Sequence, residues 1–309
     1  MKARVKPRSY TKTRMKPRIE SQTLWGYLFV GPAIFGFLAF FLAPMGFSLY
    51  MSFHSWDMIG TPVFVGFQNF IDMFTLSHAL VPQAIRVTLY FTLLTVPSVT
   101  ILSLFLAMLL NTKIKGISVF RTIYYIPSIV PAIAASALWL FLLNPMFGFF
   151  NQVLRFFGLP PSNWLHDPNM VIPALSVMAV WGAGNTVIIY LAGLQGIPTH
   201  LYEAATVDGA SGFRKFINVT VPMISPVIFF NMIMAIIGSM QTFTQAFVMT
   251  AGGPNNASLF YALLIYRTAF TNLQMGYASA MAWFFFVIVA VLTITAFKIS
   301  KFWVYHEEK

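Results

Sequence analysis

The sequence predicts an all-α integral membrane protein with six transmembrane helices and both termini in the cytoplasm. Three observations lead to this: the composition, six long apolar segments and an uneven distribution of basic residues. Of the 309 residues, 58% are apolar and only 9% are charged, and the mean hydropathy is +0.74. Soluble domains carry about 25% charged residues. A chain this apolar cannot cover its surface with polar groups, so much of that surface must face lipid.

Six segments are long and apolar enough to cross a membrane. A spanning helix needs about 20 mostly apolar residues. Prolines inside several segments do not exclude helices, because neighbouring helices and local waters satisfy the freed carbonyls in lipid. The predicted spans are 26–53, 86–110, 119–143, 171–194, 220–247 and 278–299.

Basic residues gather on one side of these spans. The two termini and the loops on their side hold sixteen Lys and Arg, whereas the other side holds only Arg86, Arg155 and Arg267. Cytoplasmic loops are enriched in Lys and Arg, so both termini are predicted to be cytoplasmic. Eight of the sixteen lie in the first 18 residues. We expect 1–22 to be a disordered tail that orients the first span, with RNA or lipid recognition as the alternative, and 23–309 to be one six-span domain.

Several chemistries are excluded by the residues that the chain lacks. It has no Cys, which excludes thiolate catalysis and Cys-ligated metals. Its five His are scattered over loops and a tail with no i, i+4 pair, so no metal site is predicted. No span holds a His that could activate a Ser nucleophile, and there is no Gly-rich Lys-Ser/Thr phosphate loop. We therefore predict no catalytic residue and no cofactor on this chain, and an energy source on another chain.

One predicted cytoplasmic loop, 198–222, combines acidic and small residues. Thr199 can cap a helix that carries Glu203 in its first turns. Gly209 supplies the conformational freedom of a tight helix exit, and a second helix is expected from about Ser211. From the residues alone, the loop is either a connector that lies on the membrane or a docking helix for a groove of a cytoplasmic partner.

The same loop resembles the EAA motif of permease subunits of bacterial ATP-binding-cassette importers. In that family the loop forms coupling helices that sit in clefts of the ATPase subunits, which implies the docking interpretation. Pro222 also matches the pattern, whereas Val219 stands where an Ile is usual. The ATPase-coupling residues that the resemblance implies, with Phe213 of the second helix, are Glu203, Ala204, Ala205, Asp208, Gly209, Ala210, Phe213 and Phe216.

The resemblance covers nearly the whole chain. Residues 26–53, 123–154 and 250–283 look like the carbohydrate-uptake branch of these permeases, and more like the first of its two permeases. The chain lacks the extra spans and large outer domain of the maltose importer's first permease, and so is similar to the short six-span form. The basic tail is not part of the family pattern.

This resemblance implies an importer-type permease fold and a role in ATP-driven, binding-protein-dependent sugar import, with an oligosaccharide as the expected cargo. The implied location is the bacterial cytoplasmic membrane, which the chain crosses several times. The implied partners are a second homologous permease, a homodimeric ATPase that binds ATP and Mg, an extracytoplasmic sugar-binding protein and membrane lipid. No nucleic-acid partner is expected.

Polar residues within two predicted spans are candidates for the sugar path. In the fifth span, Asn231, Gln241 and Gln245 share one helix face by their spacing, as do Trp181 and Asn185 in the fourth. Amides suit sugar hydroxyls, and an aromatic plane packs on a sugar ring. Alternatively, amides bond neighbouring helices and Trp anchors a span at the membrane interface. In the family, the matching regions hold substrate when the permease has a binding site.

Two other classes of protein compete with this interpretation. An ion-coupled secondary transporter or an intramembrane enzyme that acts on lipid-linked sugars would need buried acids or His within the spans. The predicted spans contain essentially none.

Overall fold

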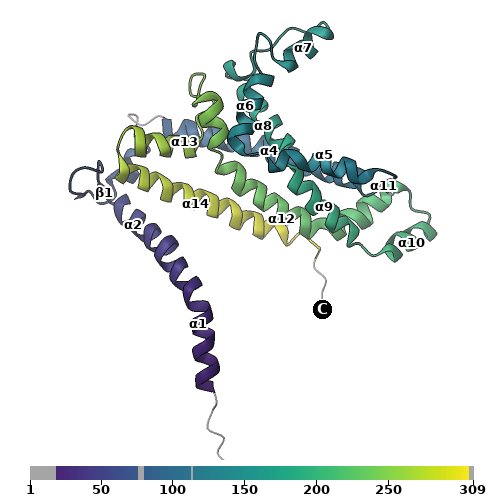
Figure 1. Cartoon of the computed structure of the whole chain (residues 1–309), viewed down its shortest axis with the longest axis horizontal. Coiled ribbons are helices and arrows are strands. Elements are labelled where there is room, and N and C mark those ends of the chain that lie inside the picture. The colour runs from purple at the N-terminus through teal and green to yellow at the C-terminus, as the bar shows by residue number, and fades with distance from the viewer. Residues whose placement is uncertain (1–18, 76–79, 113, 306–309) are drawn as a thin grey trace, which may run out of the picture. The chain divides into compact units, whose positions relative to one another are not determined.

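The computed structural model describes residues 19–75, 80–112 and 114–305, and these are mostly helical (Figure 1). The chain divides into two units, Met1–Tyr50 and Met51–Lys309. Most of the predicted basic tail lies outside the described residues.

The first unit is one long apolar helix. It begins at Ile19, so the last residues of the predicted tail are already helical. From Trp25 to Tyr50 no side chain is buried, and an apolar helix of this kind needs an apolar environment. Its parts are α1 (Ile19–Phe37), the π-helical η1 (Leu38–Leu42) and α2 (Ala43–Ser52), which ends in the second unit.

Four continuous helices are long and apolar enough to cross a membrane, and two bent helix pairs pass the same test together. By length and composition, the described residues thus hold four continuous candidate spans, and up to six if each bent pair counts as one broken span. The continuous ones are Trp25–Ser52, Leu80–Leu110 (α4), Gly212–Met240 and Met275–Ser300 (α14). The bent pairs are α5 (Ile117–Ile129) with α6 (Ala132–Leu142) and α8 (Val171–Trp181) with α9 (Gly184–Gln195).

Two predicted spans, 119–143 and 171–194, were expected to be single helices, but each is bent in the structure. Helices α5 and α6 meet at 102°, and α8 and α9 meet at 50°. The first break follows from Pro131, because a proline disfavours helical backbone in the residue before it. Val130 is accordingly extended, with φ −67° and ψ 127°.

The fifth predicted span, 220–247, is wrong at both ends. The helix begins at Gly212 and ends at Met240, after which residues 241–243 leave the helical conformation. The helix α4 likewise begins at Leu80, six residues before the predicted span. The continuous helix consists of α11 (Gly212–Lys215), the π-helical η4 (Phe216–Thr220) and α12 (Val221–Met240), and the π-helical η5 (Ala246–Thr250) follows.

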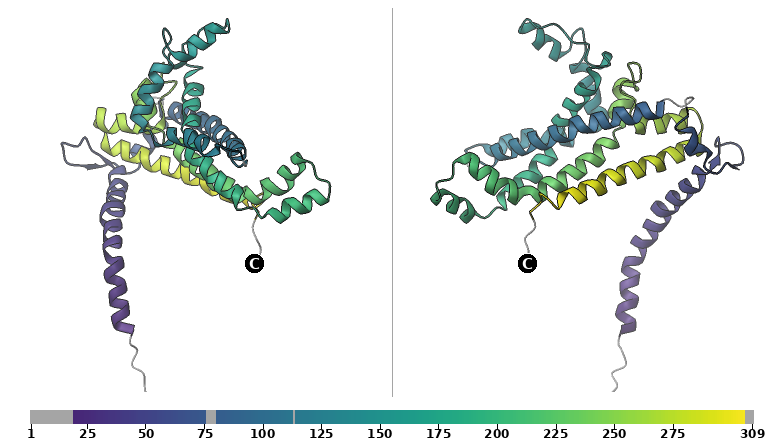
Figure 2. Two further views of the ribbon diagram at one scale, coloured as in Figure 1. Left: turned by 45° about the vertical axis from the view of Figure 1, so that its right-hand side comes forward. Right: turned by 180° about the vertical axis from the view of Figure 1, so that it is seen from behind.

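Two apolar clusters hold the second unit together. The larger packs α4, α6, α8, α13 (Tyr261–Tyr266) and α14 around Trp139, Phe260 and Tyr261. The smaller joins α4, α9 and α12 around Tyr190 and Ile224. Helices α4, α12 and α14 run side by side in all views (Figures 1 and 2).

Short elements connect the long helices. The strands β1 (His54–Ser55) and β2 (Val63–Phe64) pair antiparallel, with His54 opposite Phe64. The buried Asn69 amide donates to the carbonyls of Ser52 (2.9 Å) and His54 (3.0 Å), which fixes this connection. The other short elements are α3 (Gln68–Asp72), α7 (Phe149–Phe156), η3 (Trp164–His166), α10 (Thr199–Val207) and η6 (Arg267–Thr271).

Candidate functional site

Two features of the second unit are candidate sites: the hairpin of α10 and α11, and a cavity between the broken helices. The hairpin projects from one end of the helix bundle (Figures 1 and 2). The helix α10 begins at Thr199 itself, so the predicted capping role of Thr199 is wrong. Pro198 occupies the cap position and supplies no side-chain hydrogen bond. Its fixed φ suits the start of a helix, and its missing N–H leaves no donor to satisfy.

The predicted helix exit at Gly209 is confirmed. Gly209 has a φ of +73°, a left-handed conformation that glycine adopts without strain. Its N–H donates to the Thr206 carbonyl (3.0 Å), and the Ala210 N–H donates to the Ala205 carbonyl (2.9 Å). This pair of hydrogen bonds is a Schellman motif, which satisfies the last carbonyls of α10.

The second helix of the hairpin is tied back to the first. The second helix begins close to Ser211, as predicted, and the Ser211 hydroxyl caps it by accepting from the Arg214 backbone N–H (3.4 Å). The Lys215 ammonium donates to the Thr206 hydroxyl (2.8 Å). The Tyr202 and Thr220 hydroxyls share a hydrogen bond of 3.0 Å. The hairpin is therefore a preformed unit.

The hairpin has one packed face and one exposed face. Leu201, Tyr202 and Val219 pack on the smaller apolar cluster. On the other face, Val207 is 88% exposed and Phe213 is 72% exposed. Four of the predicted coupling residues are exposed with them: Glu203, Ala204, Asp208 and Gly209. Ala205, Ala210 and Phe216 are half-buried.

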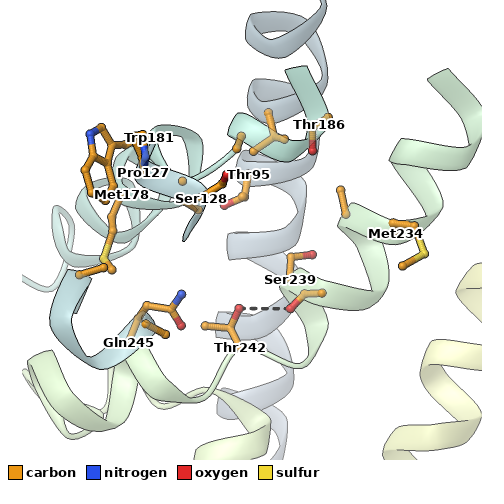
Figure 3. Close-up of a pocket in the computed structure, with 18 of the residues that line it drawn as sticks. Thr95, Pro127, Ser128, Met178, Trp181, Thr186, Met234, Ser239, Thr242 and Gln245 are labelled. Atoms are coloured by element: carbon orange, nitrogen blue, oxygen red, sulfur yellow. Dashed lines mark hydrogen bonds between the residues drawn. The ribbon is translucent and has the colours of Figure 1, made fainter. Parts of the chain in front are cut away.

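The cavity has a volume of about 390 Å³ and lies where the broken helices meet (Figure 3). The ends of α5, α8 and α12 and the beginnings of α6 and α9 reach it, and α4 forms one wall. Its polar side chains are hydroxyls and amides: Thr95, Ser128, Thr186, Asn231, Ser239, Thr242 and Gln245.

Three of the five predicted sugar-path residues line this cavity: Trp181, Asn231 and Gln245. The other two, Asn185 and Gln241, are exposed and do not. Their predicted alignment assumed unbroken helices, but α12 ends at Met240 and α8 ends at Trp181, so a spacing of four no longer means a shared face.

The hydroxyl residues of the cavity were missed because Ser and Thr in membrane helices usually bond their own backbone carbonyls. A signal for Thr95 does exist in the sequence. Thr88, Thr92, Thr95 and Ser103 recur at helical spacing along α4, and all four are buried. Such a stripe indicates the interior face of a membrane helix.

Several polar groups of the cavity have hydrogen-bonding capacity to spare. The Asn231 amide nitrogen donates to the Val227 carbonyl (3.0 Å), and its oxygen is not used in that bond. The side chains of Thr186 and Gln245 make no hydrogen bond within the part of the chain that the structure describes. Beside them, Trp181 meets Trp139 edge to face, with ring centroids 5.9 Å apart. The cavity thus offers neutral donors, neutral acceptors and an aromatic plane.

A second cavity of about 540 Å³ lies between the 55–63 loop, α3 and the start of α14. Asp57 and Asp72 are among its lining residues. The backbone N–H groups of Gly60 and then Ile59 donate to the Asp57 carboxylate and lower its pKa. No group of three or more His, Asp or Glu able to hold a metal ion occurs among the described residues.

Comparison with known proteins identifies the relatives of this chain. The family described as "Binding-protein-dependent transport system inner membrane component" matches residues 77–305. The probable ABC transporter permease protein YesP of Bacillus subtilis is 39% identical, with 94% of this chain and 95% of YesP covered. The trehalose/maltose transport system permease protein MalF of Thermococcus litoralis is 35% identical, with 90% and 94% covered.

A solved structure has the same fold over nearly the whole chain. It is a bacterial alginate ABC transporter in complex with an alginate pentasaccharide-bound periplasmic protein, and alginate is an acidic polysaccharide. The similarity has a TM-score of 0.77 at 25% identity and covers 93% of this chain and 97% of that chain.

Proposed function

The chain belongs to the family of binding-protein-dependent transport system inner membrane components, and from this premise we propose that it is a permease subunit of an ATP-driven sugar importer. The names of the relatives support a saccharide as the cargo. We expect this saccharide to be an oligosaccharide. The observation that carries the proposal is the uncharged cavity of hydroxyls, amides and one indole at the helix breaks. Secondary transporters commonly bind substrate where interrupted helices meet, and this cavity has the same kind of position.

The sugar contacts that we propose in this cavity are Trp181, Asn231 and Gln245. The indole plane can pack on the C–H face of a sugar ring, while each amide both donates to and accepts from hydroxyls. Asn185 and Gln241 lie outside the lining, so this set does not include them.

The hairpin 198–222 is proposed as the docking element for an ATPase subunit. Its exposed face combines small residues with Val207 and Phe213, and an apolar surface of this kind favours a protein partner. Glu203 and Asp208 add charges that fix the register of docking. The docking set is Glu203, Ala204, Ala205, Asp208, Gly209, Ala210, Phe213 and Phe216.

The hairpin is connected to the cavity through two helices. It follows α9 after a short turn, and it continues through η4 into α12. Thr186 of α9 and Asn231 of α12 line the cavity. We propose that closure of the ATPase pair moves the hairpin as a rigid body and that both helices carry this motion to the cavity walls. The sugar path then opens outward, where the binding protein delivers the sugar.

The proposed assembly contains a second homologous permease, two ATPase copies that bind ATP and Mg, and an extracytoplasmic sugar-binding protein. The periplasmic protein in the related alginate complex supports the last of these. Six spans with both termini in the cytoplasm, in a bacterial cytoplasmic membrane, agree with the sixteen-to-three split of basic residues. No catalytic or metal site is proposed on this chain.

The direct test is uptake by the complete complex in proteoliposomes. Accumulation of oligosaccharide should need ATP, the binding protein and this chain together. If ATP-dependent accumulation of sugar does not occur, or if the ATPase assembles without this chain, the proposed function is wrong.

A further inference from the structure

We infer that the saccharide which passes through the cavity of Trp181, Asn231 and Gln245 is uncharged, so that the importer carries neutral sugars rather than uronic acids or sugar phosphates. This inference rests on the proposed function and adds the substrate class. The relatives do not decide it, because trehalose and maltose are neutral whereas alginate is acidic.

Among the described residues, no ionisable side chain lines the cavity. Its lining consists of aliphatic, aromatic, hydroxyl and amide residues, with one proline at the end of α5. Neutral hydroxyls exchange their water contacts for equivalent contacts with groups such as Thr186 and Gln245. A carboxylate or phosphate would lose its hydration and find no countercharge there, which strongly disfavours its transfer.

Backbone dipoles do not replace the missing countercharge. Helix N-termini attract anions and C-termini repel them. The N-terminal ends of α6 and α9 contribute Ala132 and Ala183 to the lining. The C-terminal ends of α5, α8 and α12 contribute Ser128, Trp181 and Ser239. Two helix N-termini, which attract anions, are thus opposed by three helix C-termini, which repel them. The helix dipoles therefore give the cavity no net preference for an anion.

The basic side chains of the predicted outer segments do not line the cavity. Arg86, Arg155 and Arg267 are not among the lining residues. The Arg267 guanidinium donates a hydrogen bond to the Ala251 carbonyl, which holds it in the turn after η5. A negatively charged sugar in this cavity would therefore have no cationic partner among the lining residues that the structure describes.

The test offers the complete importer a mixed pool of sugars. Proteoliposomes with both permeases, the ATPase and the binding protein receive neutral oligosaccharides, uronic-acid oligosaccharides and sugar phosphates, and mass spectrometry identifies what accumulates inside. We expect neutral sugars to exceed charged ones by about tenfold or more. Preferential accumulation of charged sugars overturns the inference and leaves the proposed function intact. If no sugar accumulates, the proposed function fails and the inference fails with it.

An isosteric charge change tests whether this cavity sets the preference. Gln245→Glu adds a negative charge to the lining with almost no change in shape, and it should lower uptake of the accumulated neutral sugar about tenfold. The matched control, Gln241→Glu, makes the same change outside the lining and should leave uptake within about twofold. Assembly of each variant is measured by co-purification of the ATPase. Equal uptake by the two variants at equal assembly overturns the assignment to this cavity.

Discussion

The ammonium group of Lys215 donates a 2.8 Å hydrogen bond to the hydroxyl of Thr206, across the turn that separates α10 from α11. Together with the Tyr202–Thr220 bond of 3.0 Å, it holds the two helices of the hairpin in one arrangement. A preformed surface loses little conformational entropy when it docks. The hairpin is therefore suited to move as a rigid body when a partner that is docked on its exposed face moves.

The first prediction concerns docking. Glu203→Lys reverses an exposed charge on the proposed docking face. It should weaken co-purification of the ATPase or uncouple ATP hydrolysis from uptake, because like charges placed in an interface oppose association. Asn218→Lys adds a positive charge at another exposed position of the same loop and serves as the control. If both variants take up sugar normally with a full complement of ATPase, Glu203 is not a docking residue.

The second prediction concerns the turn of the hairpin. Gly209 has a φ of +73°, so Gly209→Val strains the backbone by about 1–2 kcal/mol and distorts the docking face. Uptake should fall while the permease still inserts in the membrane. Gly212→Val is the matched control, because Gly212 has ordinary helical backbone and open space around it. An equal loss in both variants would show that the left-handed turn is unimportant.

The third prediction concerns packing at the broken fourth span. A methyl group at Gly184 would overlap the backbone carbonyl oxygen of Tyr124. Gly184→Ala should therefore push α9 away from α5 and reduce the amount of assembled complex, by the roughly 1–3 kcal/mol typical of overpacking. Gly182→Ala places the same methyl in ordinary van der Waals contact and should assemble normally. Detergent-solubilised complex measured by size-exclusion chromatography distinguishes the two.

The fourth prediction concerns topology. A reporter that is active only outside the cytoplasm should work when fused after residue 65 or residue 160. It should fail after residue 115, after residue 210 or at the C-terminus, because basic residues keep those segments cytoplasmic. The fusions after residues 115 and 160 lie on either side of the bent α5–α6 pair, so they also decide whether that pair crosses the membrane once. An active fusion after residue 210 contradicts the six-span topology.

The sequence predicts the helical membrane class because a spanning helix must be apolar along its whole length, which composition reveals directly. It also predicts the helix exit at Gly209 and the start of a second helix at about Ser211, because turns depend on local backbone chemistry. The cavity depends on tertiary packing instead. No residue of the local sequence marks the end of α12 at Met240. If the helix continued, the spacing of four would place Gln241 and Gln245 on one face. The proline at 131 marks a break, but the angle of 102° depends on what α5 and α6 pack against.

The last prediction concerns the sugar path. Gln245 lines the cavity and makes no hydrogen bond within the described residues, so its amide is available to a sugar. Gln245→Leu should lower the affinity for sugar roughly 2–10-fold, since each hydrogen bond contributes about 0.5–1.5 kcal/mol. Trp181→Ala should have an effect of similar size if the indole packs on the sugar ring, and almost none if it only anchors α8.

The control separates a lost sugar contact from lost helix packing. Gln241→Leu makes the same change outside the lining and should leave uptake nearly unchanged. A residue that bonds a neighbouring helix contributes about 0.6 kcal/mol to membrane helix association, so its loss lowers the amount of complex rather than the uptake per complex. Uptake is therefore divided by the amount of ATPase that co-purifies. Stimulation of the ATPase by the sugar-loaded binding protein should persist in part, because the hairpin is intact. Unchanged uptake per complex in Gln245→Leu and Trp181→Ala would move the sugar contacts to the second permease.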